Sequence, residues 1–357
     1  MACEGRGTNT IVHPTAANDA GQADAQVSED TLPAGLSLEA LAEWQATKAA
    51  VLGAHVVLTL GRDDHDPEMF GIVADVAINA EGQIAVLDAS VDEVGVFDAD
   101  GRHLGRFGGI GDGPEELRRA SSIEALSDGR FLVSARGRIK IFEPSAESWQ
   151  VSASYDLPLL AIQNSCLAAD NRLFVSSLHP TEKHAIREVA VENGVVVAGF
   201  GSGYLDPNPA ARLHLSRGLV DCVSTASGII FGSKLLSSVR RYALDGSLVW
   251  TTALTNHSVL RITENRTTSA ITFDDSQPYD VLESVHATPS GRLVLIQYTR
   301  LFPNDLPEST RTYLLDIESG VGAALRKSVP PIVDVNAHGI VTVDGLHPVV
   351  KVWSVDW

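Results

Sequence analysis

The run Asp63-Asp64-His65-Asp66 is the densest group of side chains in this chain that could hold a metal ion. His214 and His347 are distant in sequence but could join it in a folded protein. Carboxylate oxygens suit calcium, whereas several imidazoles suit zinc or another transition metal. Acidic loop residues are also commonly just solvated. Two alternatives therefore stay open: a divalent-metal site at Asp63, His65, His214 and His347, or an ordinary acidic surface with no cofactor.

Other catalytic patterns are missing from the sequence. No Gly-x-Ser-x-Gly elbow is present, so a serine hydrolase of that type has no support. The glycine-rich stretch from Gly108 to Gly113 precedes Pro114 and an apolar run, and does not open a helix as a phosphate-binding loop would. We therefore looked for the elements that could bring the histidines and acids together.

Tight turns recur along the chain, each following a β-rich run and each ending in a residue that accepts a positive φ. They end at Gly82, Gly129, Asn171, Gly228, Gly291 and Gly339, which are 47, 42, 57, 63 and 48 residues apart. A unit of this length with four short strands cannot bury both faces of its own sheet, so the units must stack around an axis. The sequence predicts an all-β fold, a six-bladed β-propeller of four-stranded antiparallel blades. An open β-sandwich or a two-domain β protein is the competing interpretation.

The last blade lacks an outer strand because the chain stops at Trp357. The segment Val56-Val57-Leu58-Thr59-Leu60-Gly61 is similar to the outer strands His103–Gly108 and Val196–Gly201. We therefore predict that this N-terminal strand completes the last blade. Such closure removes exposed sheet edges.

The segment Gly105 to Leu117, followed by Ile123 to Val133, resembles an NHL-type repeat. In that family an outer strand ends in Phe-Gly, a Gly-Pro-Gly-Glu-Phe-like loop follows, and the next inner strand leads to Asp-Gly. The resemblance is clear over residues 55 to 145 and fades through blades 3 to 5. It implies a six-bladed propeller of the sort common in bacterial extracytoplasmic proteins, with motif residues that are structural.

The chain differs from two metal-dependent propeller families. The amidating lyases carry Pro-His before several inner strands, whereas this chain has Leu213-His214 once. The calcium-dependent lactonase-like hydrolases use a central Glu, Asn and Asp from different blades, a set that the sequence does not identify residue by residue. Neither resemblance therefore identifies site residues in this chain.

The N-terminal region precedes the repeats. We predict a flexible tether over residues 1–35, a helix and lead-in over 36–54 with Ser37 as N-cap, and the propeller over 55–357. Cys3, near the start of this polar segment, predicts lipid attachment as in a bacterial lipoprotein, with an incidental cysteine as the alternative. These features indicate an extracytoplasmic, periplasmic location with a lipid anchor.

Charge and cysteines restrict the function further. The chain has 27 basic and 45 acidic side chains, a net charge of −18, which disfavours nucleic acid as a partner. Cys166 stands four residues before Asp170, whereas Cys222 stands five before Ser227. Their side chains should point to opposite sheet faces, so we expect no disulfide between them.

Long loops should rise on one face, over residues 202–217, 255–280 and 299–311, and insertions of this kind often carry function. The residues predicted to contact a partner are Tyr204, Leu205, Arg212, Leu301, Phe302 and Leu306. A lid packed on the propeller is the alternative. The leading hypothesis is a non-enzymatic extracytoplasmic protein-interaction scaffold, an extrinsic subunit bracing a membrane protein complex. The rival is a metal-dependent hydrolase or lyase with its site at the channel mouth, and a small-ligand receptor ranks third.

Overall fold

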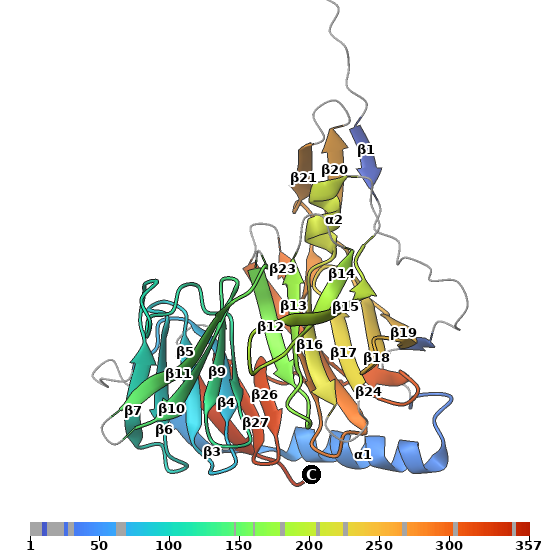
Figure 1. Cartoon of the computed structure of the whole chain (residues 1–357). Coiled ribbons are helices and arrows are strands. Elements are labelled where there is room, and N and C mark those ends of the chain that lie inside the picture. The colour runs from blue at the N-terminus through green and yellow to red at the C-terminus, as the bar shows by residue number, and fades with distance from the viewer. Residues whose placement is uncertain are drawn as a thin grey trace, which may run out of the picture.

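Six antiparallel sheets form the blades of a ring (Figure 1). The computed structural model describes residues 9–12, 25–27, 32–61, 69–145, 148–159, 161–178, 183–204, 208–223, 228–265, 270–302, 306–344 and 348–357. The inner strands contact one another in a closed circle, β4 to β8, β12, β16, β22, β26 and back to β4. The predicted six-bladed propeller is therefore confirmed.

Each blade is a four-stranded meander running outward from the axis. Blades 1 to 3 comprise β4 (Val73–Ile78), β5 (Ile84–Asp88), β6 (Glu93–Phe97), β7 (His103–Gly108); β8 (Ser122–Ala125), β9 (Phe131–Ala135), β10 (Arg138–Pro144), β11 (Trp149–Asp156); and β12 (Ala161–Leu167), β13 (Leu173–Leu178), β14 (His184–Val189), β15 (Val196–Ser202). Blades 4 to 6 comprise β16 (Gly218–Val223), β17 (Gly228–Ser233), β18 (Ser238–Ala243), β19 (Leu248–Leu254); β22 (Tyr279–Ala287), β23 (Leu293–Phe302), β24 (Leu306–Asp316), β25 (Gly322–Ala324); and β26 (Ile332–Asn336), β27 (Gly339–Asp344), β28 (Val349–Ser354) with β3 (His55–Leu60).

The ring closes through β3, which pairs antiparallel with β28 from the other end of the chain. Leu60 lies opposite Val350, and His55 lies opposite Ser354, with one bulge between. The first strand of the propeller thus supplies the outer strand of its last blade, as predicted.

A tight turn follows the inner strand of a blade and ends in a residue with positive φ. Gly82 has φ of 78° and its N–H donates to the carbonyl of Asn79, 3.0 Å away. Asn171 occupies the same place in blade 3 with φ of 62°, which asparagine tolerates better than most residues do. These turns join each inner strand to its neighbour.

Six hydrophobic cores fill the six interfaces between blades. In β5, Ala85 and Leu87 face the core shared with blade 2, whereas Ile84 and Val86 face the core shared with blade 6. Every residue of β5 is buried. This two-sided burial is why the inner strands are almost continuously apolar in sequence.

Helix α1 (Leu38–Gly53) packs beneath blades 5 and 6 (Figure 1). Ser37 is its N-cap, with Oγ accepting from the N–H of Ala40 at 3.1 Å. Trp44 is 1% exposed, and its indole N–H donates to the carbonyl of Leu314 at 2.8 Å. The predicted helix is thus confirmed as a helix packed on the propeller. No helix in the described ranges is long and apolar enough to cross a membrane.

A fifth strand lies on the outer edge of blade 4. β2 (Ala25–Val27) pairs parallel with β19, placing Ala25 opposite Thr252. β2 lies within the predicted tether, so part of that segment is held against the ring.

The prediction that Cys166 and Cys222 form no disulfide is wrong. The two residues are bonded, with their Cα atoms 5.4 Å apart. The inference that the two side chains lie on opposite sheet faces was correct. In neighbouring blades, however, opposite faces bring the two side chains together instead of keeping them apart. The face of blade 3 toward blade 4 and the face of blade 4 toward blade 3 are opposite faces of equivalent sheets, so these two side chains meet in one core.

Shortening the closing strand's buried side chain should weaken the ring. Leu60 is 5% exposed in the core between blades 6 and 1. We expect Leu60→Ala to lower the free energy of unfolding by about 2–5 kcal/mol. Val57→Ala is the matched control, because Val57 lies on the same strand with 58% exposure. Equal losses of thermal stability in the two variants would contradict closure by β3.

The disulfide should also contribute to stability. Its two cysteines are 56 residues apart in sequence, so a Cys166→Ala, Cys222→Ala double variant should lose roughly 2–4 kcal/mol. Thiol labelling of denatured protein should find two more thiols after reduction than before. Equal labelling before and after reduction would refute the bond.

Candidate functional site

A small projection rises from one face of the ring above blades 4 and 5 (Figure 1). It consists of α2 (Pro209–Leu215) and a three-stranded sheet in the order β1 (Asn9–Val12), β20 (Arg261–Asn265), β21 (Ala270–Asp274). Its segments come from the loops before blades 4 and 5 and from the N-terminal region. We call this unit the projection.

Asn208 joins the helix of the projection to its sheet. As N-cap of α2, its Oδ1 accepts from the N–H groups of Ala210 and Ala211 at 2.9 and 3.3 Å. Its Nδ2 donates to Glu264 Oε1 on β20 at 2.8 Å. Pro209 at the first helical position favours the helix start.

The projection has its own hydrophobic core, separate from the six between blades. The buried residues of this core are Leu215, Leu235, Leu236, Leu260, Ile262 and Tyr279. Ile271 and Phe273 of β21 pack against it from the sheet. The unit is therefore fixed to blades 4 and 5 by packing.

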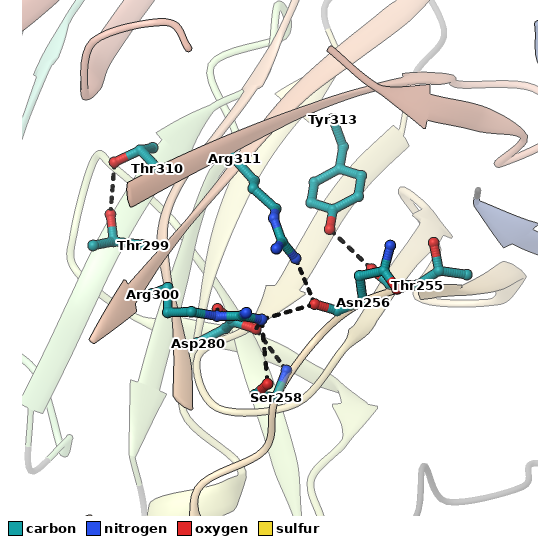
Figure 2. A network of polar contacts seen from close by, with 9 residues as sticks. All are labelled: Thr255, Asn256, Ser258, Asp280, Thr299, Arg300, Thr310, Arg311 and Tyr313. Carbon is teal, nitrogen blue, oxygen red and sulfur yellow. Dashed lines mark hydrogen bonds and ion pairs between the residues drawn. The ribbon is translucent and has the colours of Figure 1, made fainter. Parts of the chain in front are cut away.

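A polar network joins the loop before β20 to β22, β23 and β24, at the base of the projection, and Figure 2 shows its side chains. Arg300 on β23 bonds both oxygens of Asp280 on β22, each at 3.0 Å, and Asp280 is 3% exposed. Arg300 and Arg311 both donate to the carbonyl of Asn256, which precedes β20. Asp280 also accepts the N–H of Ser258. Bidentate Arg–carboxylate geometry fixes direction, so the network orients the loop that carries the projection.

The predicted partner-contact residues divide into two groups. Tyr204 and Leu301 are partly buried and pack against the core of the projection. Phe302, at the end of β23, is 42% exposed, and Arg212 is half-buried on α2. Leu205 lies outside the described residues.

Leu306 begins β24, where its backbone pairs with Phe302 across the hairpin. β25 pairs only with Tyr313 to Leu315 of β24. The β23–β24 hairpin extends well beyond these residues, as far as the pair Phe302 and Leu306. Leu301, the residue before Phe302, packs against the core of the projection, so this end of β23 lies beside the projection.

Of the four residues of the predicted metal site, only His214 lies within the described residues. Asp63, His65 and His347 lie outside them, as does Cys3. His214 lies on α2, where its ring packs edge-on against Phe273 with centroids 4.9 Å apart, and burial lowers its pKa. Within the described ranges, no three His, Cys, Asp or Glu side chains converge closely enough to hold a metal ion.

A polar cavity of about 200 Å³ lies on the axis of the ring and is lined by all six inner strands. Its polar lining comes from successive blades: Asp75, Glu124, Asn164 with Ser165, Asp221, His286, and Asp334 with Asn336. None of these residues was predicted from the sequence. The available signal was an acidic residue inside an otherwise apolar inner strand, as in Val73-Ala74-Asp75-Val76-Ala77.

Several of these side chains connect one inner strand to the next. Asp75 Oδ2 accepts the N–H of Ile123 on blade 2 at 2.9 Å. In blade 4, Asp221 accepts the N–H of Ala287 on blade 5 in the same way. The inner strands of neighbouring blades belong to different sheets and do not pair with each other. These bonds therefore satisfy N–H groups that have no partner within their own sheet.

Asn164 connects blades 3 and 4 through both ends of its amide. Its Oδ1 accepts the N–H of Val220 at 3.0 Å, and its Nδ2 donates to the carbonyl of Val220 at 2.8 Å. A Glu, an Asn and an Asp from different blades, here Glu124, Asn164 and Asp221, therefore do line the axis. Asn164 and Asp221 serve the backbone, which is a structural role.

The electrostatics of the cavity are unusual because four carboxyl groups share it. Burial raises the pKa of Asp221 and of Asp334 to about 7. Burial also raises the pKa of Asp75 and of Glu124 well above the usual range, and nearby carboxylates add to the rise. Burial lowers the pKa of His286 to about 4. The cavity therefore combines a neutral imidazole with carboxyl groups that hold protons up to neutral pH.

Comparisons with known proteins identify the class of fold. No family model matches the chain. No curated protein matches it either. A solved protein of Bacteroides fragilis, described as exported, superposes with a TM-score of 0.58 at 10% identity, over 94% of this chain and 100% of that one.

A member of the duf4221 family from Bacteroides vulgatus superposes with a TM-score of 0.57 at 11% identity, over 85% of this chain and 98% of that one. At these identities the likeness shows the fold alone. The protein is a six-bladed β-propeller, and the NHL resemblance stays a prediction.

Titration of the axial carboxyls should be visible in the stability of the protein. The folded state binds the Asp334 proton more tightly than the unfolded chain, so this carboxyl favours folding at low pH. That contribution is lost as pH rises from the ordinary value of 3.8 through about 7. Asp334→Asn cannot titrate. From about pH 5 to pH 8, the Tm of the variant should therefore rise relative to the Tm of the wild type by roughly 2–4 °C.

The control for this comparison is Asp100→Asn in an exposed turn. A Tm difference between Asp334→Asn and the wild type that stays the same at both pH values would contradict the assignment. Differential scanning calorimetry measures both pairs directly.

Proposed function

We propose that the protein is a non-enzymatic scaffold that works outside the cytoplasm and binds a partner protein through the projection. The carrying observation is the projection itself, a packed unit built from three separate segments and added to a ring that closes without it. Insertions that are ordered in this way, and held by a buried ion pair at the base, suit a fixed contact surface.

The disulfide supports the location. Cys166 and Cys222 are bonded between two blades, and such bonds persist in oxidising compartments outside the cytoplasm. We further propose that the partner is a membrane protein complex and that Cys3 carries the lipid that holds the chain near it. Support for the anchor is the position of Cys3 before a long polar segment.

The β23–β24 hairpin beside the projection supplies an exposed aromatic side chain for the proposed contact. Phe302 is 42% exposed, and aromatic side chains are enriched at protein interfaces. An aromatic anchor with a half-buried arginine, Arg212, on the adjoining helix suits a partner surface that is apolar with acidic groups at its rim.

The test is co-purification of tagged full-length protein from detergent-solubilised membranes of its native host. Phe302→Asp should lose the partner, because it places a charge at the centre of the contact. Val197→Asp is the matched control, since Val197 is 61% exposed on the outer strand β15 of blade 3. Recovery of the wild type as a free monomer, or equal retention of the partner by both variants, would refute the proposal.

The rival function, a metal-dependent hydrolase or lyase, stays a prediction. It depends on Asp63, His65 and His347, which lie outside the described residues. His214 already packs against Phe273. Metal analysis of protein purified without chelator tests this rival independently of the scaffold.

A further inference from the structure

The axial cavity is lined by polar atoms that take no part in the hydrogen bonds between blades. In Asp75 and Asp221, both carboxylate oxygens accept backbone N–H groups. Glu124 differs, because Oε1 accepts from Ser165 Oγ at 3.1 Å and Oε2 accepts no hydrogen bond from the described part of the chain. One carboxylate oxygen therefore faces the cavity without a protein donor.

His286 provides a second unused group on the same cavity. Its Nε2 is buried and has no hydrogen-bond partner among the described residues. A buried polar atom without a partner is unfavourable, so a ligand that supplied the missing bond would bind favourably. Because the imidazole is neutral, it adds no positive charge to the cavity.

The size and lining of the cavity restrict the ligand. A volume of about 200 Å³ has room for several water molecules and exceeds what one bare ion needs. The described His and acidic side chains do not converge on one point as metal ligands must. Among the described residues, no Phe, Tyr or Trp side chain lines the cavity for stacking against a sugar, and four carboxyl groups disfavour an anion.

We propose that the axial cavity binds a small organic cation, a primary amine or diamine, whose ammonium group donates to Glu124 and His286. An ammonium group has three N–H donors and no acceptor, which complements a carboxylate oxygen and an unpartnered imidazole nitrogen. Asp334, on the blade next to His286, provides a second carboxylate for the other end of a diamine.

Binding of such a cation is coupled to proton release. The titratable groups that face the cavity are Asp75, Glu124, Asp221, His286 and Asp334. The four acids have raised pKa values, so an incoming cation displaces protons from them. Affinity therefore rises with pH between about 6 and 8, while His286 stays neutral throughout.

Isothermal titration of the full chain with 1,4-diaminobutane tests the proposal. We expect one site per chain, affinity higher at about pH 8 than at about pH 6, and loss of at least about tenfold in affinity in Glu124→Gln. Glu115→Gln, at an exposed loop residue of the same type, should bind as the wild type does. Glu124→Gln keeps the side-chain size and an acceptor for Ser165, and its thermal unfolding confirms that it is folded.

Three results would overturn the proposal. These are no binding of the diamine up to about 10 mM, equal affinity in Glu124→Gln and wild type, or binding of calcium chloride in place of the diamine. As a second readout, the diamine should raise the Tm of the wild type and of Glu115→Gln, but not that of Glu124→Gln.

Discussion

Hydrogen bonds from inner-strand side chains to the backbone of the next inner strand hold the centre of this ring together. Asp75, Asn164 and Asp221 each satisfy backbone groups on a neighbouring blade. An apolar residue at any of these positions would leave a buried N–H unpaired, at a cost of about 1–3 kcal/mol. The axis must therefore be polar even though the strands around it are apolar, and a cavity lined by acids follows from the way the blades meet.

The molecule separates two kinds of surface. The axis has a narrow polar cavity, whereas the projection rises from one face of the ring above blades 4 and 5, beside the hairpin that carries the exposed Phe302. Both depend on blades 4 and 5, because Asp221 connects their inner strands and Asp280 and Arg300 fix the projection above them. A change in the packing of these two blades would reach both sites.

Local chemistry made most of the fold predictable. Turns that end in Gly or Asn mark the blades, and the likeness of Val56–Gly61 to two outer strands identified the closing strand. Ser37 and the residues after it predicted α1. Each of these inferences needs only neighbouring residues, since φ preferences and helix caps act over three or four positions.

The sites were less predictable because they depend on which faces meet across the ring. Cys166 and Cys222 were correctly placed on opposite faces, but only the circular arrangement makes those faces adjacent. The axial residues come from six blades, and no local pattern groups them. Acids within apolar strands, such as Asp75 and Asp221, were the signal that could have been used.

Pairing of β3 with β28 also sets the order of events during synthesis. The ribosome releases β3 before any strand of blades 1 to 5, whereas its partner β28 (Val349–Ser354) follows all of them. Blades can form one after another on the nascent polypeptide, but β3 has no partner in the sixth blade until β28 has been synthesised. The bonds between β3 and β28 therefore complete the ring, and a chain without Val349–Ser354 would lose the seam between its first and last strands.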